Sequence, residues 1–183
     1  MSEAVVWIKP LSLRCLLESG ENGAVMTTLR RSPKPGDIAL CIQRNDMNRT
    51  IYLCGPINGR TTEDATSWRE TVKQRWNGGY LDPMRRDYRG RELEPGIAAE
   101  IVAGDIEDIQ ASDAILVFFD KPSVGTSMEV FYAKHVLGKP VVIIDASDKP
   151  LSPWLIHHSD HQTKHVSVAL ATLNMIFNRR DEA

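Results

Sequence analysis

Two apolar runs after Met47 constrain the fold of this chain more than any other feature. "DAILVFF" is apolar after its first residue and "PVVII" is apolar throughout, which is typical of strands buried on both faces of a sheet. The segment between them, "TSMEVFYAKHVL", is predicted as a helix over residues 126–137. A buried strand, a helix and a second buried strand in this order favour a parallel sheet covered on both faces.

Further strands and helices are predicted on both sides of this unit. "TIYLCGP" is interpreted as a strand that ends in a Gly-Pro turn, and "GYLDP" as a short second strand. Helices are expected over residues 62–76, capped by Thr61 or Thr62, over residues 97–111, and around "VSVALATLNMIF". The sequence thus predicts an α/β fold, a flavodoxin-like doubly wound sheet of about five mainly parallel strands.

Sheets of this type bind ligands outside the carboxyl ends of their strands. Gly55-Pro56 and the loop Ser123–Gly125 both follow predicted strands and fall at such ends. We therefore expect a binding site at these two segments.

Residues 1–48 have a different character from the rest of the chain. Runs such as "AVVWI" and "DIALCIQ" surround turns that contain Gly and Pro, without sustained helical periodicity. We expect an N-terminal extension over residues 1–48, either a small β lobe or a partly disordered segment, followed by one domain over residues 49–183. An early start assignment is a third interpretation, because Met47 stands just ahead of the first core strand.

The composition argues against several classes of partner. A formal net charge of −2 gives no overall attraction to a nucleic acid polymer or an anionic membrane. No apolar span reaches the roughly 18 residues of a membrane helix, and no signal peptide is recognised. The 3 cysteines lack metal-ligand spacing, which favours reduced thiols in a soluble, cytoplasmic protein. The histidines of "SPWLIHHSDHQTKH" give no metal pattern, since His161 and His165 flank an expected loop.

Glu129 stands near the start of the helix predicted over residues 126–137 and has two interpretations. Thr126 and Glu129 match the capping box, in which a hydroxyl and a carboxylate satisfy free amide groups at a helix start. Alternatively, the positive end of the helix dipole keeps the carboxylate ionised beside a strand-end pocket. Such a carboxylate can attack the anomeric carbon of a sugar and form a covalent glycosyl ester.

Asp105 is the second candidate carboxylate. It lies in "GDIEDIQASDAIL" with Asp108 and Asp113, and each of the three fits an ordinary solvated charge. Asp105 precedes the apolar strand by about two helical turns. We therefore expect it near the carboxyl edge of the sheet only if the preceding segment bends back.

Three segments in one order resemble the nucleoside 2-deoxyribosyltransferase family, including the related 2′-deoxynucleoside 5′-monophosphate N-hydrolases. They are "IYLCGPINGRT", "DIEDIQASDAILV" and "PSVGTSMEVFYAKHVLGKPVVII", and the match covers residues 50–144. The resemblance implies a flavodoxin-like fold and cleavage of the N-glycosidic bond of a 2′-deoxynucleoside or its 5′-monophosphate. The partners would be that nucleoside or nucleotide and a free nucleobase. No metal or organic cofactor is implied, and a homodimer or higher homo-oligomer is expected.

The resemblance also assigns roles by position. Glu129 matches the nucleophilic glutamate of the family, which favours the nucleophile over the cap. Asp105 matches an aspartate near the sugar and the departing base, where it orients the substrate or assists proton transfer. Tyr52 matches a tyrosine that adjoins the nucleophile, and Gly55 matches the glycine of a turn that lets backbone approach the substrate.

The loop before Glu129 bears on the choice of substrate. Ser123 stands where relatives acting on free nucleosides carry an acidic residue and where the monophosphate hydrolases carry serine. Ser123, Gly125, Thr126 and Ser127 would suit a 5′-phosphate, because hydroxyls and amide groups at a helix start donate to anions. In the alternative interpretation these residues only build the turn and the helix cap.

Other residues near the first strand leave this choice open. Pro56 occupies a place where the hydrolases tend to have a phosphate-binding serine, and proline has no amide donor. Asn58 and Arg60 could compensate. The basic run "DPMRRDYRGRE" could reach over a site and bind phosphate, or its arginines could pair with Asp82 and Asp87.

Two functions of other classes remain open at this point. The first is a non-catalytic nucleotide-binding or sensing module of the same fold, in which Glu129 is only a helix cap. The second is a protein-interaction role in which residues 1–46 carry the partner surface. Fold alone does not choose among them.

Overall fold

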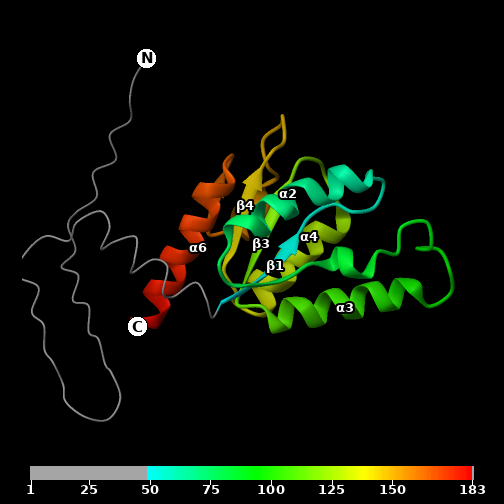
Figure 1. The fold of residues 1–183 in the computed structure, drawn as a ribbon, viewed down its shortest axis with the longest axis horizontal. Coiled ribbons are helices and arrows are strands. Elements are labelled where there is room, and N and C mark those ends of the chain that lie inside the picture. Colours follow the sequence, from blue (N-terminus) through cyan, green and yellow to red (C-terminus); the bar gives the residue numbers. More distant parts are fainter. Residues whose placement is uncertain (1–48, 183) are drawn as a thin grey trace, which may run out of the picture. The chain divides into compact units, whose positions relative to one another are not determined.

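The computed structural model describes residues 49–182, and the extension predicted over residues 1–48 lies outside this range. At its centre is a five-stranded sheet with the order β2-β1-β3-β4-β5 (Figure 1). All of its strand pairs are parallel. This order is the one found in flavodoxin-like doubly wound sheets, so the predicted fold class is confirmed.

The strands are β1 (Thr50–Cys54), β2 (Gly79–Leu81), β3 (Ala114–Phe119), β4 (Val141–Asp145) and β5 (His161–Thr163). The α-helices are α2 (Thr62–Arg75), α3 (Ile97–Ala111), α4 (Val124–Phe131), α5 (Pro153–His157) and α6 (Val166–Asp181). A 3-10 turn, η1 (Pro83–Arg86), follows β2, and a π-helical turn, η2 (Tyr132–Val136), continues α4. No helix of the described chain is long and apolar enough to cross a membrane.

Two apolar clusters bury the two faces of the sheet. One face packs against α2 and α6, and its cluster includes Ile51 and Leu53 of β1. The other face packs against α3, α4 and α5, and its cluster includes Tyr52 and Cys54 of the same strand. Because successive side chains of a strand point to opposite faces, β1 contributes one pair of residues to each cluster.

Local sequence signals account for the helices α2 and α3. α2 begins after Thr61, whose side-chain oxygen accepts a hydrogen bond from the Asp64 amide at 3.1 Å. The helix predicted over residues 97–111 is confirmed at both ends as α3. α2 therefore follows from capping chemistry, whereas α3, which has no side-chain cap at its start, follows from apolar periodicity.

The start of α4 differs from the prediction in a way that affects Glu129. The helix begins at Val124, two residues earlier than expected, and its cap is Ser123, whose hydroxyl accepts from the Thr126 amide at 3.4 Å. Glu129 therefore lies in the second turn, beyond the amide groups that a cap satisfies. The interpretation of Thr126 and Glu129 as a capping box is wrong.

Between β4 and α6 the sequence locates no helix or strand and predicts only a loop between His161 and His165. This region contains the short helix α5 and the edge strand β5, in which His161 pairs with Val142. The expected loop between His161 and His165 is therefore partly wrong, since His161 begins β5 and His165 caps α6. The strand sequence is the polar "HQT", which carries no apolar signal for a sheet.

Gly55 follows β1 directly and is buried. A Cβ atom added there would lie 2.9 Å from Cζ2 of Trp68 and 3.1 Å from the Phe118 carbonyl oxygen. The rings of Trp68 and Phe118 stack with centroids 5.2 Å apart, so neither can move away easily. The close packing of α2 on the sheet thus requires glycine at this turn.

We expect Gly55→Ala to lower the free energy of unfolding by about 1–3 kcal/mol, because the added methyl overpacks the Trp68–Phe118 stack. Urea unfolding followed by tryptophan fluorescence measures this change. Gly125→Ala is the matched control, since a Cβ at Gly125 on α4 meets nothing within 4 Å. Equal stability of the two variants would contradict the packing argument.

Candidate active site

Because successive side chains of β1 point to opposite faces of the sheet, two polar side chains of this strand lie under α3 and α4. Tyr52 and Cys54 are fully buried and face these helices, because the alternate residues of β1 face α2 and α6. Within the sheet, Tyr52 pairs with Ile115 and Cys54 with Val117 of the central strand β3. A hydroxyl and a thiol therefore stand in an otherwise apolar layer.

The Glu129 carboxylate reaches down from α4 to this layer. The Cys54 thiol donates to Oε2 of Glu129 at 2.8 Å. Burial, and after it the nearby charge of Asp105, raise the pKa of Glu129 to about 7. Cys54, Tyr52 and Arg69 oppose part of this increase. The structure thus aims Glu129 inward and makes its ionised form costly.

The Tyr52 hydroxyl lies between the two acidic side chains. It is buried and has no hydrogen-bond partner of ordinary geometry among the described residues. Burial raises the pKa of Tyr52 well above its usual value, and the charges of Glu129 and Asp105 add to the increase. Tyr52 therefore keeps its proton at neutral pH and remains a hydrogen-bond donor.

Asp105 comes to the same place from α3. Its carboxylate is partly buried, and Oδ1 accepts from Nη2 of Arg86 at 3.1 Å. Burial raises the pKa of Asp105, while the Arg86 guanidinium acts in the opposite direction. No bend in the preceding segment is needed, because α3 packs directly against β1 and α4. The structure thus brings Tyr52, Asp105 and Glu129 together.

The residues predicted after β1 are placed less centrally. The Gly55 carbonyl accepts from Nη2 of Arg69 at 3.0 Å, and Asn58 lies exposed in the following turn. Arg60 forms an ion pair with Asp120, at the end of β3. This pair links the loop after β1 to the loop after β3, so Arg60 has a partner within the chain.

Ser123 and the first turn of α4 mainly make contacts that build the helix start. Ser123 is the cap, and the Ser127 hydroxyl donates to the Ser123 carbonyl at 2.8 Å. Thr126 is buried, whereas Gly125 is exposed. The turn-and-cap interpretation of Ser123 and Ser127 therefore describes their contacts among the described residues.

The arginines of "DPMRRDYRGRE" are all paired within the chain. Arg85 and Arg86 bind Asp108, Arg89 binds Asp87, and Arg91 binds Glu94. Of the two acidic partners considered for this run, Asp87 does pair with one of its arginines. The Asp82 carboxylate instead binds Nε of Arg69 at 3.2 Å and Nζ of Lys73 at 2.7 Å, both on α2, and Arg85 donates to the backbone carbonyl of Asp82 at 3.1 Å.

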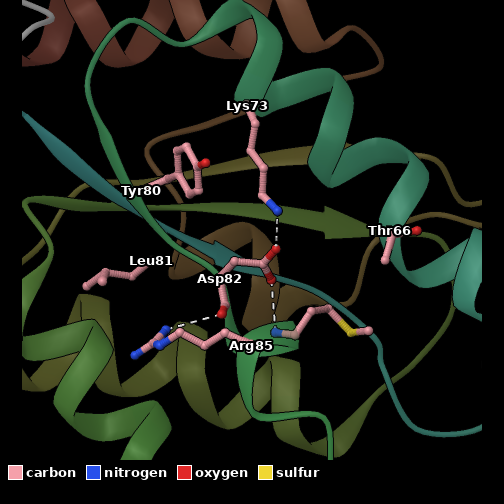
Figure 2. Close-up of a pocket in the computed structure, with 7 residues that line it drawn as sticks. Thr66, Lys73, Tyr80, Leu81, Asp82 and Arg85 are labelled. Atoms are coloured by element: carbon pink, nitrogen blue, oxygen red, sulfur yellow. Dashed lines mark hydrogen bonds and ion pairs between the residues drawn. The ribbon is translucent and has the colours of Figure 1, made fainter.

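Asp82 lies in a surface pocket of about 350 Å³ beside β2. Figure 2 shows its carboxylate reached by Lys73 from α2, with Tyr80 and Arg85 on either side. A second hollow of about 510 Å³ between α4 and α5 is lined by Phe131, His135, Pro153, Trp154, His157 and His158. Neither hollow is lined by Glu129 or Asp105.

Three side chains of the site were not predicted. Cys54 could have been found from its position two residues after Tyr52 on one strand. Arg69 shares the buried face of α2 with Ala65 and Val72, so its helical phase already placed it inside. Arg86 gave no such signal within its basic run.

The described residues hold no group of three or more His, Cys, Asp or Glu side chains arranged to bind a metal ion. The site chemistry available from the chain itself is that of two carboxylates, a phenol and a thiol. An ionised carboxylate can act as a nucleophile, and a second carboxyl group nearby can bind a hydroxyl or move a proton.

The fold has counterparts among solved structures. A 2-deoxyribosyltransferase from the psychrotolerant bacterium Bacillus psychrosaccharolyticus is 17% identical, with a TM-score of 0.56 over 65% of this chain and 88% of that one. A conserved protein from Enterococcus faecalis V583 is 15% identical, with a TM-score of 0.47 over 68% of this chain and 87% of that one. At such identities, the likeness to the first structure supports the fold alone.

A search among curated protein sequences found no match. The sequence profile of the family described as nucleoside 2-deoxyribosyltransferase matches residues 51–176, more than half of the chain and all of the site. The profile indicates an enzyme of the deoxyribosyltransferase type. This chain therefore belongs to the nucleoside 2-deoxyribosyltransferase family.

Proposed function

We propose that this protein cleaves the N-glycosidic bond of 2′-deoxynucleosides or their 5′-monophosphates and releases or exchanges the nucleobase. Glu129 is the nucleophile and forms a covalent glycosyl ester. The observation that carries this proposal is the inward-facing carboxylate of Glu129, held by Cys54 at 2.8 Å with Tyr52 and Asp105 beside it. A helix cap or a solvated charge would have no reason to adopt this position.

In the first step an oxygen of Glu129 attacks C1′ of the sugar. The C1′–O bond forms while the C1′–N bond breaks, and the bonding electron pair leaves with the base. Positive charge develops on the sugar ring in the transition state, and the ionised carboxylate stabilises it. Asp105 orients the sugar or passes a proton to the departing base.

In the second step another nucleophile attacks C1′ and expels Glu129. Water gives hydrolysis, and a second nucleobase gives transfer. Both outcomes share one ester intermediate, so the chemistry of Glu129 does not choose between them. The choice depends on which nucleophile reaches C1′ while the ester lasts.

We propose that the substrate is the 5′-monophosphate and that its phosphate group binds at the start of α4. The Ser123 hydroxyl and the first amide groups of this helix stand where an anion is favoured. Pro56 has no backbone amide donor, which argues against a phosphate bound at the turn after β1. Assays with a deoxynucleoside and its monophosphate in parallel distinguish the two substrates.

We also propose a cytoplasmic homodimer or higher homo-oligomer. Val124, Met128 and Trp154 expose large apolar surfaces on α4 and α5, which an association of copies would cover.

We expect light scattering to give at least twice the mass of the chain, and Trp154→Glu to shift the protein toward the monomer. A charge is costly in an apolar interface, which is the reason for the shift. Wild-type protein that stays monomeric at micromolar concentrations would contradict this proposal.

Glu129→Gln is expected to lower kcat for base release by at least about 10³-fold, because the amide cannot form the glycosyl ester. Chromatography of free base, after incubation with deoxynucleosides and deoxynucleotides, measures the loss. Glu107→Gln is the matched control, since Glu107 is exposed on α3. Saturable nucleotide binding without any free base from the wild type would instead favour the non-catalytic module.

The pH dependence of kcat/KM should report the ionisation of Glu129. With a pKa of about 7, we expect the rate to fall about tenfold per pH unit below that value and to level off above it. Cys54→Ala removes a hydrogen bond to the ionised form, so the midpoint should move to higher pH. A midpoint near 4.5 in the wild type would show that the carboxylate is not buried in the working enzyme.

A further inference from the structure

Arg86 joins two carboxylates of α3 from the turn that follows β2. Its Nη2 atom lies 3.1 Å from Oδ1 of Asp105 and 2.7 Å from Oδ2 of Asp108. Asp105 and Asp108 are three residues apart and share one face of the helix. A single guanidinium therefore ties η1 to the middle of α3 at the level of the site.

Gly104 makes room for this guanidinium. A Cβ atom at Gly104 would lie 2.6 Å from Nε and 2.9 Å from Cζ of Arg86. Glycine inside a helix costs about 0.5–1 kcal/mol relative to alanine, so helix stability alone argues against it. The close approach of Arg86 supplies the reason for glycine at this position.

Arg85 is the natural comparison, because it is the next residue in the chain and binds only Asp108 of this pair. Asp108 is nearly inaccessible and accepts from both arginines. Asp105 accepts from Arg86 alone among the arginines of this turn. Loss of Arg86 would leave Asp108 paired through Arg85, while Asp105 would lose its cation.

We propose that Arg86, lodged against Gly104, is a positioning residue that fixes the Asp105 carboxylate beside Tyr52 and Glu129. It acts through Asp105 and does not itself touch the substrate. The kinetic consequence rests on the function proposed above, whereas the contact with Asp105 exists in the free protein.

The physical role of Arg86 is to let two neighbouring carboxylates be ionised together. The charge of Asp105 raises the pKa of Glu129, and the charge of Asp108 raises the pKa of Asp105, because negative charges in a partly buried place repel. The Arg86 guanidinium offsets this repulsion on the Asp105 side. Without it, the pair should take up its first proton at a higher pH, and the orientation of Asp105 should loosen.

The test compares Arg86→Gln and Gly104→Ala with the control Arg85→Gln. Gly104→Ala deletes no charge and displaces Arg86 only by its added methyl group. Carboxyl ¹³C NMR of the free protein follows the titration of the pair, with Asp105→Asn and Glu129→Gln for assignment. We expect the first protonation to move up by about one pH unit in both test variants and to stay in place in Arg85→Gln.

Kinetics of base release from a deoxynucleoside monophosphate supply the second readout. We expect kcat to fall about 10- to 100-fold in Arg86→Gln, with KM changed far less, because the reacting groups and not the binding contacts are displaced. Arg86→Lys restores the charge but not the fork geometry, so we expect it to restore the titration more than kcat. If Arg86→Gln fails to fold, Arg86→Lys replaces it as the test variant.

Two results separate this inference from the proposed function. If the wild-type enzyme is active and neither the titration nor kcat changes in Arg86→Gln and Gly104→Ala, the proposed role of Arg86 is overturned. If the titration shifts as expected in these two variants while the wild-type protein releases no base, Arg86 is supported as the partner of Asp105 and the proposed function is contradicted.

Discussion

The alternation of β1 side chains between the two faces of the sheet is the constraint on which the rest of the structure depends. Ile51 and Leu53 complete the apolar layer beneath α2 and α6, and this forces Tyr52 and Cys54 toward α3 and α4. A shift of one residue in register would exchange the two pairs and lose both the core and the site. Packing on one face of the sheet therefore fixes which side chains of β1 face the site on the other.

Positive charge supports the site from two directions. Arg69, buried beneath the turn after β1, lowers the pKa of Glu129 and binds the Gly55 carbonyl. Arg86 approaches from the turn after β2 and pairs with Asp105. A carboxylate pair in a partly buried place would otherwise hold a shared proton, so these arginines decide how much of it is ionised at neutral pH.

Much of this arrangement follows from the sequence, and the rest depends on tertiary contacts. Apolar runs and their spacing predicted the parallel α/β sheet and α3, because such patterns reflect burial of whole elements. They could not predict that α4 begins at Val124, since Ser123 and Thr126 offer the same capping chemistry. β5 is a polar edge strand of three residues and carries no pattern. The partners of Arg86 lie 19 and 22 residues away, a pairing that no local signal encodes.

The inward orientation of Glu129 has a consequence for the whole chain as well as for its site. An acid whose pKa is raised by folding binds its proton more tightly in the native state than in the unfolded one. This contribution favours the native state fully below about pH 4.5 and is lost as the pH rises toward 7. The same rise in pH that ionises the carboxylate for attack on the sugar therefore removes part of the free energy that holds the native state together.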